Sequence, residues 1–374
     1  MVRKCVRGSL RFGFFVFVVV SAGIAQSTPL ATTHATGVAS ATASPTGTQP
    51  GAQRAIPQPD AGNQFVAIDP FTQIKDMQRG VNVLGYDPIW NDFDKRRFKV
   101  EYFKMLHDAG FSTIRVNLQA FRHMDNLNRL NPEWLRTLDW VVDNALANGL
   151  TVILDEHDYV PCGQDAVMCR ARLTAFWQQV APRYKNEPNK VLFEILNEPN
   201  KAVTIELWNQ LLSECLSIIR ATNPDRNVVI GPAWWNGIRL LNALVLPQSD
   251  RHIIATVHYY SPMNFTHQGA VWNPPTAKLS GITWGTDADK QAVAADFATA
   301  QAWSKANDRP ILLGEFGAYD KGDMDSRAGY TSTVARTAES LGWAWTYWQF
   351  DSNFIVYNVD KSEWVEPIRN ALVP

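Results

Sequence analysis

The sequence predicts an α/β protein that folds as a single (β/α)8 barrel. Eight short apolar runs indicate strands, and the segments between them have the spacing of amphipathic helices. Runs that are apolar on both faces are typical of a parallel sheet covered by helices, and eight repeats of strand and helix close into a barrel. The predicted strands are residues 80–84, 113–118, 150–154, 191–195, 228–230, 253–257, 311–313 and 344–348.

Glycine residues mark the carboxyl ends of two predicted helices. Residues 98–109 and 132–147 end at Gly110 and Gly149, and glycine suits the left-handed residue that follows a helix. Residues 203–221 form a third segment of this kind. A chain of 374 residues with 46% hydrophobic content could hold two ordinary domains, but the repeated strand and helix favour one barrel domain over residues 63–374.

The first 62 residues differ in composition from the rest. Residues 1–25 begin with a basic stretch, continue as an apolar run from Phe12 and end on small residues, which is the pattern of a signal peptide. The apolar run is shorter than the roughly 20 residues of a membrane-spanning helix, although a retained anchor is the alternative. Residues 26–62 contain no aromatic residue and are predicted to be a disordered linker rich in Ser, Thr, Ala and Pro. We therefore expect a secreted protein, extracellular or periplasmic, that is not bound to a membrane.

The charge of the chain argues against one class of partner. The formal net charge is −1, and loss of Arg3, Lys4, Arg7 and Arg11 with the signal peptide would bring it to −5. Nucleic-acid-binding domains usually concentrate Lys and Arg on one face, so a neutral substrate fits this chain better. We expect a monomer that needs no cofactor or metal.

Three cysteines remain once the signal peptide is removed. Cys162 and Cys169 flank a short polar loop and could form a disulfide in an oxidising compartment. Cys215 lies in an apolar helical pattern and is predicted to be buried as a small hydrophobic residue. The spacing of the cysteines is not that of metal ligands.

Polar and aromatic residues gather where the predicted strands end. In (β/α)8 barrels the catalytic groups project from the carboxyl ends of the strands. Packing alone would not collect such residues at one end of apolar strands. The residues in or just after successive strands are Arg115, Asn117, His157, Asn197, Glu198, Trp234, Trp235, His258, Tyr260, Glu315 and Trp348.

Two of these residues, Glu198 after the fourth strand and Glu315 after the seventh, suggest cleavage of a glycosidic bond. That reaction needs a proton for the leaving oxygen and a carboxylate to stabilise the charged anomeric centre. Across a barrel the two carboxyl groups could stand about 5–5.5 Å apart, the separation of a retaining enzyme. Arg115, if close to Glu315, would favour its ionised form, while the neighbouring charge would raise the pKa of Glu198.

The motifs around these residues resemble glycoside hydrolase family 5, an endoglucanase-rich family of clan A. The resemblance spans residues 78–365 and rests on four elements in order. They are Leu196-Asn197-Glu198-Pro199, His258-Tyr259-Tyr260, Leu313-Gly314-Glu315-Phe316-Gly317 and Trp348. The resemblance implies retaining hydrolysis of a β-linked glycan, with Glu198 as acid/base and Glu315 as nucleophile.

The same resemblance implies roles for further residues. Asn197 would bind the sugar 2-hydroxyl, Tyr260 would contact the nucleophile, and Arg115 and His258 would support catalysis. Residues 265–272 resemble the loop after the sixth strand of endoglucanases, and residues 79–90 also look like this family. The chain departs from the family at Glu156, where several endoglucanases have a second histidine. The implied substrate-binding residues are His157, His267, Trp272 and Trp348. Asn82, Trp90 and Trp234 are predicted as further substrate-binding residues from their places in or after the strands, since the flat faces of tryptophan rings suit stacking on sugar rings.

Several of these residues also allow a structural interpretation. Arg115 could be the buried partner of some other acid, because an arginine inside a strand is costly unless it is paired. Residues 197–199 could be the start of a helix, with Pro at the first helical position. The two histidines could be core residues or metal ligands, although no paired-histidine spacing accompanies them. Trp235 and Trp284 could plug the barrel instead of stacking on sugar rings.

The hypothesis that follows is a secreted endo-β-1,4-glucanase whose partner is a β-glucan polysaccharide or oligosaccharide. An endo-β-1,4-mannanase, or an enzyme active on mixed-linkage glucan or xyloglucan, is the nearest alternative, because loop shapes set the preferred glycan. A non-catalytic polysaccharide-binding barrel would keep the aromatic cleft without turnover. A metal-dependent hydrolase of amides or esters is a third alternative, and a chelator would abolish its activity.

Overall fold

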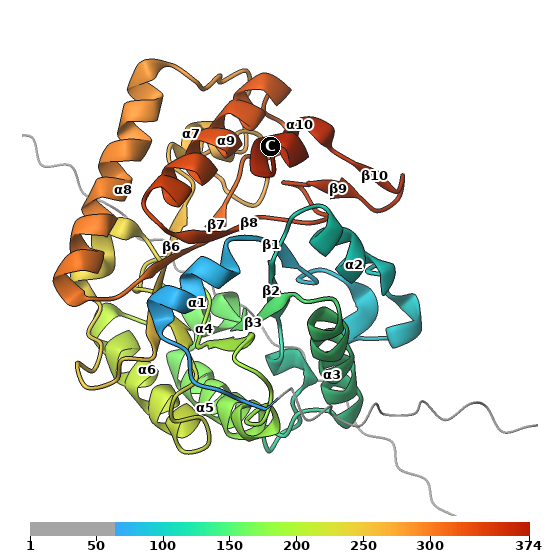
Figure 1. Cartoon of the computed structure of the whole chain (residues 1–374), viewed down its shortest axis with the longest axis vertical. Helices are drawn as coiled ribbons and strands as arrows, with labels where there is room; N and C mark the ends of the chain where they lie inside the picture. Colours follow the sequence, from blue (N-terminus) through green and yellow to red (C-terminus); the bar gives the residue numbers. More distant parts are fainter. Residues whose placement is uncertain (1–63) are drawn as a thin grey trace, which may run out of the picture. The chain divides into compact units, whose positions relative to one another are not determined.

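The computed structural model describes residues 64–374, in which eight parallel strands form a closed barrel in sequence order (Figure 1). Each strand pairs with the next, and β1 pairs with β8 to close the barrel. The predicted (β/α)8 fold is confirmed. The strands are β1 (Arg79–Val83), β2 (Thr113–Leu118), β3 (Thr151–Glu156), β4 (Val191–Glu194), β5 (Val228–Ile230), β6 (Ile253–Tyr259), β7 (Ile311–Phe316) and β8 (Ala344–Tyr347).

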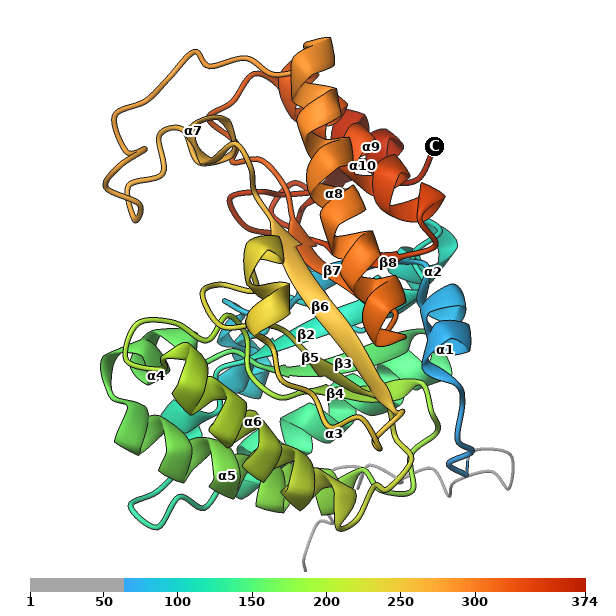
Figure 2. The same cartoon turned by 90° about the vertical axis from the view of Figure 1, so that its left-hand side faces the viewer.

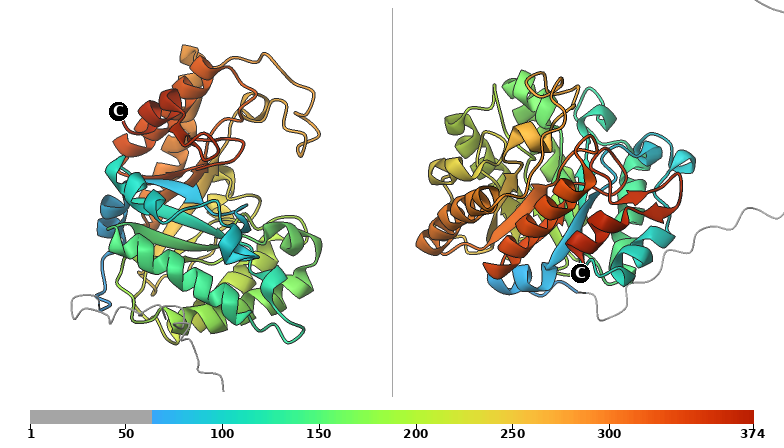
Figure 3. Two further views of the ribbon diagram at one scale, coloured as in Figure 1. Left: turned by 90° about the vertical axis from the view of Figure 1, so that its right-hand side faces the viewer. Right: turned by 90° about the horizontal axis from the view of Figure 1, so that it is seen from above.

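Helices cover the outside of this barrel (Figures 2 and 3). The long ones between strands are α3 (Pro132–Ala147), α5 (Ala166–Arg183), α6 (Ile205–Arg220), α8 (Asp287–Asn307) and α9 (Met324–Ser340). The shorter ones are α1 (Pro70–Met77), α2 (Glu101–Asp108), α4 (Tyr159–Gln164), α7 (Met263–Thr266) and α10 (Glu366–Leu372), with the 3-10 helices η1 (Pro88–Trp90), η2 (Phe93–Lys95), η3 (Phe121–His123) and η4 (Ile238–Ala243). A small antiparallel pair, β9 (Tyr357–Asn358) and β10 (Glu363–Trp364), follows the barrel.

Local signals explain where the helices begin and end. The Asn131 side chain accepts the N–H of Glu133, and Pro132 takes the first position of α3, where a missing N–H costs nothing. At the start of α8, Thr286 and Asp289 form a reciprocal capping box. Gly110 and Gly149 have φ values of 93° and 77°, so the predicted helix ends fall where glycine is required.

Three strands extend further than the apolar pattern indicates. β3 continues through Asp155 to Glu156, β6 through His258 to Tyr259, and β7 through Glu315 to Phe316. The sequence prediction stopped at the first polar or small residue after each apolar run. Inside a closed barrel a polar side chain can remain in a strand, provided that partners across the barrel satisfy it.

Two apolar clusters stabilise the fold. The larger fills the space between the strands and the surrounding helices. The smaller lies inside the barrel, where Ile74 and Met77 of α1 pack on six strand residues; α1 is the blue helix near the middle of Figure 1. The six residues are Ile153, Leu192, Val229, Ile254, Leu312 and Ala344. The amino-terminal end of the barrel is therefore closed by an apolar plug.

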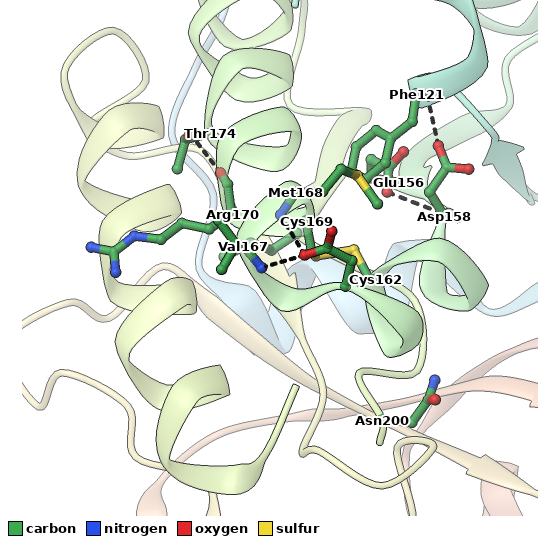
Figure 4. Close-up of a disulfide and its surroundings, with 12 residues drawn as sticks. Phe121, Glu156, Asp158, Cys162, Val167, Met168, Cys169, Arg170, Thr174 and Asn200 are labelled. Carbon is green, nitrogen blue, oxygen red and sulfur yellow. Dashed lines mark hydrogen bonds between the residues drawn. A yellow bond between two sulfur atoms is a disulfide. The ribbon is translucent and has the colours of Figure 1, made fainter. Parts of the chain in front are cut away.

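Cys162 and Cys169 form a disulfide that joins α4 to α5 (Figure 4). Cys215 is a free cysteine buried in α6. Among the helices of residues 64–374, none combines the length and the apolar character that crossing a membrane would require. The predicted signal peptide and linker, residues 1–62, lie outside the described part of the chain.

Candidate active site

The carboxyl ends of the barrel strands surround a cavity of about 1090 Å³. It contains most of the residues that the sequence singled out. Those that line it are His157, Asn197, Glu198, Trp234, Trp235, His258, Tyr260, His267, Trp272, Glu315 and Trp348. Strand ends that are far apart in the sequence therefore meet around one hollow.

Glu198 and Glu315 face each other across this cavity. An oxygen of each carboxyl group and a ring nitrogen of His258 all lie within 4.8 Å of one another. Nδ1 of His258 is 2.8 Å from Oε1 of Glu198 and 3.6 Å from Oε2 of Glu315. The hydroxyl of Tyr260 donates to Oε2 of Glu315 at 2.9 Å. The two carboxyl groups can thus approach the same small group of atoms in a substrate.

Arg115, which is fully buried, links several acids beneath the cavity. Its guanidinium makes two hydrogen bonds with Glu194, at 2.7 and 2.8 Å, and one with Glu315 at 2.8 Å. Asp155 lies 3.2 Å away, and Asn197 accepts a further hydrogen bond at 2.9 Å. Both interpretations of Arg115 therefore hold: it is the structural partner of other acids and also a neighbour of Glu315.

The surroundings separate the pKa values of the two facing glutamates. Burial, and then the negative charge of Glu315, raises the pKa of Glu198 well above its ordinary value. Burial also raises the pKa of Glu315, but Arg115 and the hydrogen bond from Tyr260 oppose that shift. Burial and the positive charge of Arg115 lower the pKa of His258 well below its ordinary value, so its ring is neutral near pH 7. Glu198 is the better proton donor and Glu315 the better carboxylate.

His157 and Trp348 form one wall of the cavity. Their rings stack with centroids 5.5 Å apart and an angle of 8° between planes. Nδ1 of His157 is 2.5 Å from Oδ2 of Asp155, and Nε2 is 3.4 Å from the Asn197 amide. The backbone N–H of Asn197 donates to the carbonyl of Glu156 at 2.8 Å, which ties the end of β4 to the end of β3.

Exposed aromatic rings lie at the cavity rim. Trp234 and Trp235 follow β5 and are 44% and 42% exposed, with ring centroids 5.4 Å apart. Trp272 is 50% exposed on the loop between α7 and α8, where it packs against Tyr319. Flat apolar rings that remain in solvent suit stacking on the C–H faces of sugar rings.

Two predicted substrate-binding residues lie elsewhere, and these predictions are corrected. Trp90 is buried, packs against Trp134 and donates to the carbonyl of Leu84, so it belongs to the core. Asn82 is buried beneath the cavity and accepts a hydrogen bond from Arg115 at 2.8 Å. It can act on a substrate only through its neighbours Arg115 and Asn117. Trp284, for which packing was the alternative, is also buried, against Tyr330.

Some residues of the site were missed by the sequence analysis. Glu194 lies inside an apolar run. The only signal for it in the sequence was Arg115 on another strand, because a buried arginine needs an acidic partner. Asn236, which contacts His258, was also missed, because only the two tryptophans before it were considered as site residues after the fifth strand. Further residues that line the cavity are Tyr86, Tyr159, Lys201, Met263, Ser352 and Phe354.

Glu198, His258 and Glu315 are also the one group in residues 64–374 whose ligand atoms could converge on a cation. Arg115 already places a positive charge 2.8 Å from Glu315, and Tyr260 donates to its other oxygen. Both oxygens of Glu315 therefore have donors. The expectation that the protein needs no metal stays a prediction.

Comparison with known proteins relates this geometry to a family. Residues 75–354 match the sequence model described as Cellulase (glycosyl hydrolase family 5). Endoglucanase H of Acetivibrio thermocellus is 30% identical over 319 residues, which cover 82% of this chain and 34% of that protein. Endoglucanase A of Clostridium longisporum is 26% identical over 306 residues, 76% of this chain and 56% of that protein. The chain spans about a third to a little over half of the length of these relatives.

This chain matches a larger share of the length of solved structures with the same barrel. Thermotoga maritima Cel5A in complex with mannotriose is 36% identical, with a TM-score of 0.78 over 82% of this chain and 100% of that chain. The same protein has a structure in complex with cellobiose, at 37% identity and the same TM-score and coverage. The cellulose synthase subunit Z of Clostridioides difficile is 32% identical, with a TM-score of 0.75 over 80% of this chain and 100% of that chain.

Proposed function

Because the chain belongs to glycosyl hydrolase family 5, we propose that it is a secreted, retaining endo-β-1,4-glucanase. The observation that supports this proposal most directly is the facing pair Glu198 and Glu315, with Arg115 beside the second of them. One oxygen of each carboxyl group lies within 4.8 Å of one oxygen of the other, which favours the roughly 5–5.5 Å separation of a retaining pair over the about 6.5–9.5 Å of an inverting pair.

The proposed reaction proceeds in two displacements. A carboxylate oxygen of Glu315 bonds to the anomeric carbon as the bond to the leaving oxygen breaks, and Glu198 transfers its proton to that oxygen. A water molecule then attacks the same carbon, gives its proton to the Glu198 carboxylate, and releases Glu315. The separated pKa values of the two glutamates favour this division of roles.

The proposed substrate is a neutral β-1,4-linked glucan. The curated relatives with this domain are called endoglucanases, and one related structure contains cellobiose. Mannan is the second candidate, because another structure of the same Thermotoga maritima protein contains mannotriose. Activity on mixed-linkage glucan or xyloglucan is a further alternative. The exposed rings of Trp234, Trp235 and Trp272 suit any of these chains.

A time course on carboxymethylcellulose, barley glucan and galactomannan tests the reaction and the substrate together. Proton NMR of the first product distinguishes the mechanisms, since retention releases the β-anomer first. Early release of the α-anomer would overturn the proposed mechanism. Faster cleavage of galactomannan would make the protein a mannanase, and absence of turnover on all three would favour a polysaccharide-binding barrel. Loss of activity in excess EDTA would favour the metal-dependent alternative.

Secretion is proposed from the N-terminal sequence and from the disulfide. Disulfides such as Cys162–Cys169 persist in oxidising compartments and are rare in the cytosol. The protein recovered from the medium or periplasm of its host should begin near residue 26, as measured by N-terminal sequencing. Recovery of full-length protein from the cytosol would contradict this proposal.

A further inference from the structure

The segment directly after β5 has an unusual backbone. Trp234, Trp235 and Asn236 have φ values of 59°, 59° and 52°, so three successive residues that are not glycine adopt the left-handed conformation. Each such residue is strained, asparagine least of the three. Strain of this kind persists only where the surroundings hold it, and it often marks a functional segment. The backbone N–H of Trp234 donates to the carbonyl of Pro199 at 2.7 Å, next to Glu198.

Asn236 holds His258 at two points. Its carbonyl accepts the backbone N–H of His258 at 3.0 Å, and its side-chain Nδ2 lies 3.2 Å from Nε2 of the imidazole. The asparagine side chain is fully buried, and its Oδ1 has no hydrogen-bond partner in residues 64–374. Oδ1 packs so tightly on Gly231 that a Cβ there would lie 2.3 Å away.

This packing favours one orientation of the amide. With Nδ2 toward the ring, the buried group left without a partner is a carbonyl oxygen. With the amide reversed, an NH2 group that needs two acceptors would take the position against Gly231, where the side chain makes no hydrogen bond, and orphaned N–H groups are rarer than orphaned oxygens. The amide N–H therefore donates to Nε2 of His258. A neutral ring that accepts at Nε2 carries its proton on Nδ1.

We propose that Asn236 is a positioning residue for the acid proton: its side-chain amide holds His258 as the Nδ1–H tautomer and so directs the proton of Glu198 to Oε2. Nδ1 is 2.8 Å from Oε1 of Glu198, and an N–H there requires an oxygen that accepts. When Glu198 is protonated, its hydrogen must then lie on Oε2. Oε2 has no hydrogen bond from residues 64–374 and is free to face a glycosidic oxygen.

This inference rests on the proposed role of Glu198 as the acid. It also implies that His258 stabilises the Glu198 carboxylate by donating to it, which opposes the larger effects that raise the pKa of Glu198. Other charged or titratable groups face the same two side chains from β2, β3, β4 and β7 and from the segments after β1, β3 and β6, and they remain in place when Asn236 is changed. They are Tyr86, Arg115, Asp155, His157, Tyr159, Glu194, Tyr260 and Glu315.

Two substitutions at Asn236 test the proposal. Asn236→Asp has the same shape and tolerates the left-handed conformation, but its carboxylate can only accept, so it selects the opposite tautomer. Asn236→Gly keeps the backbone conformation and removes the amide. The measurement is kcat/KM on two substrates, a cellooligosaccharide whose leaving oxygen needs a proton and a dinitrophenyl cellobioside whose leaving group does not.

The two substrates should respond differently. General acid catalysis contributes about 10²–10⁴-fold, so we expect Asn236→Asp to lose about tenfold to a hundredfold on the cellooligosaccharide and less than about twofold on the activated glycoside. The basic limb of the pH profile should move to higher pH, because Nδ1 no longer donates to the Glu198 carboxylate. Asn236→Gly should lose less. Equal losses on both substrates would show a merely structural role and overturn the proposal.

A matched control and a direct measurement complete the test. Asn128 is also left-handed, with φ of 56°, and is not among the residues that line the cavity, so Asn128→Asp and Asn128→Gly should leave both substrates unaffected. Nitrogen-15 NMR of ring-labelled histidine in the unmodified protein reports the tautomer of His258 even if the variants do not fold. A proton on Nε2 would refute the proposal. Absence of hydrolysis of either substrate by the unmodified protein would instead refute the proposed function.

Discussion

The two ends of the barrel interior are built from the same strands but differ in character: one end is an apolar packing layer and the other is a mostly polar layer beneath the cavity. Near the amino-terminal end, Ile153, Leu192, Ile254, Leu312 and Ala344 form an apolar layer under α1. Two residues further along each strand, the inward positions are Asp155, Glu194, Thr256, Gly314 and Thr346. Because side chains alternate with a period of two, these residues share the inner face one layer higher. A shift of two residues thus separates the part that stabilises the fold from the part that holds the reacting groups.

The largest expected effect is on catalysis, at Glu315, which directly follows Gly314 of the upper layer. Glu315→Gln removes the proposed nucleophile but keeps the size of the side chain, so kcat should fall on the order of 10⁴-fold or more. The thermal unfolding midpoint should stay close to that of the parent, since Arg115 keeps Asp155 and Glu194 as partners and is not left as an unpaired buried charge. Calorimetry and initial rates check both. Retention of more than a tenth of the activity would contradict the assignment of Glu315.

Arg115→Met should affect both activity and stability, because Arg115 connects the site to the fold. Asp155, Glu194 and Glu315 would lose their shared positive charge, and breaking a buried ion pair costs about 3–5 kcal/mol. Urea denaturation measures the free energy of unfolding. Adding Glu194→Gln should recover part of the stability without recovering activity. Wild-type stability in Arg115→Met would show that the network is not structural.

The apolar layer should show the reverse pattern. Met77→Ala opens a cavity under the barrel and should cost about 2–5 kcal/mol of stability, with unchanged kcat below the unfolding transition. Phe71→Ala on the exposed side of the same helix is the control, and it should change stability by about 0.5 kcal/mol or less. A lower kcat in Met77→Ala would mean that the two layers are coupled.

The smallest expected effect is on the pH dependence of stability, and it concerns two adjacent carboxyl groups at the end of β3. Asp155 faces Arg115, which lowers its pKa against the effect of burial, whereas burial and then the charge of Asp158 raise the pKa of Glu156 well above its ordinary value. A carboxyl group whose pKa is higher in the native than in the unfolded state does not lower the free energy of unfolding at pH values below the unfolded pKa. As pH rises from the unfolded pKa toward the native pKa, the group makes the protein progressively less stable.

Glu156→Gln should therefore stabilise the protein, by little near pH 4 and by more toward pH 8. Unfolding midpoints of variant and parent across this range provide the measurement. Asp155→Asn is the opposite case, since a lowered native pKa contributes stability that is lost as pH falls. An advantage of Glu156→Gln that shrinks as pH rises would show that Glu156 is ionised and paired in the native state.

Much of the fold and of the site was predictable because the relevant signals are local. Strand positions follow from apolar runs, and helix limits follow from residues such as Asn131 and Gly149, which act within a few positions of themselves. Glu198 and Glu315 were found because each follows an apolar strand. Trp90 was misassigned because a loop tryptophan has the same local pattern whether it meets Trp134 or solvent. Its burial depends on a helix about 40 residues away in the sequence.

The sequence by itself determined the order of strands and helices, their capped ends and the gathering of polar residues at one end of the barrel. Only the tertiary structure decided which of these residues meet. Closure of the barrel brings Glu194 and Glu315 onto one guanidinium and places Asn236 behind His258. The physical reason is range: hydrophobic periodicity and capping act between near neighbours, whereas ion pairs and buried hydrogen bonds depend on atoms that the chain brings together only after it has folded.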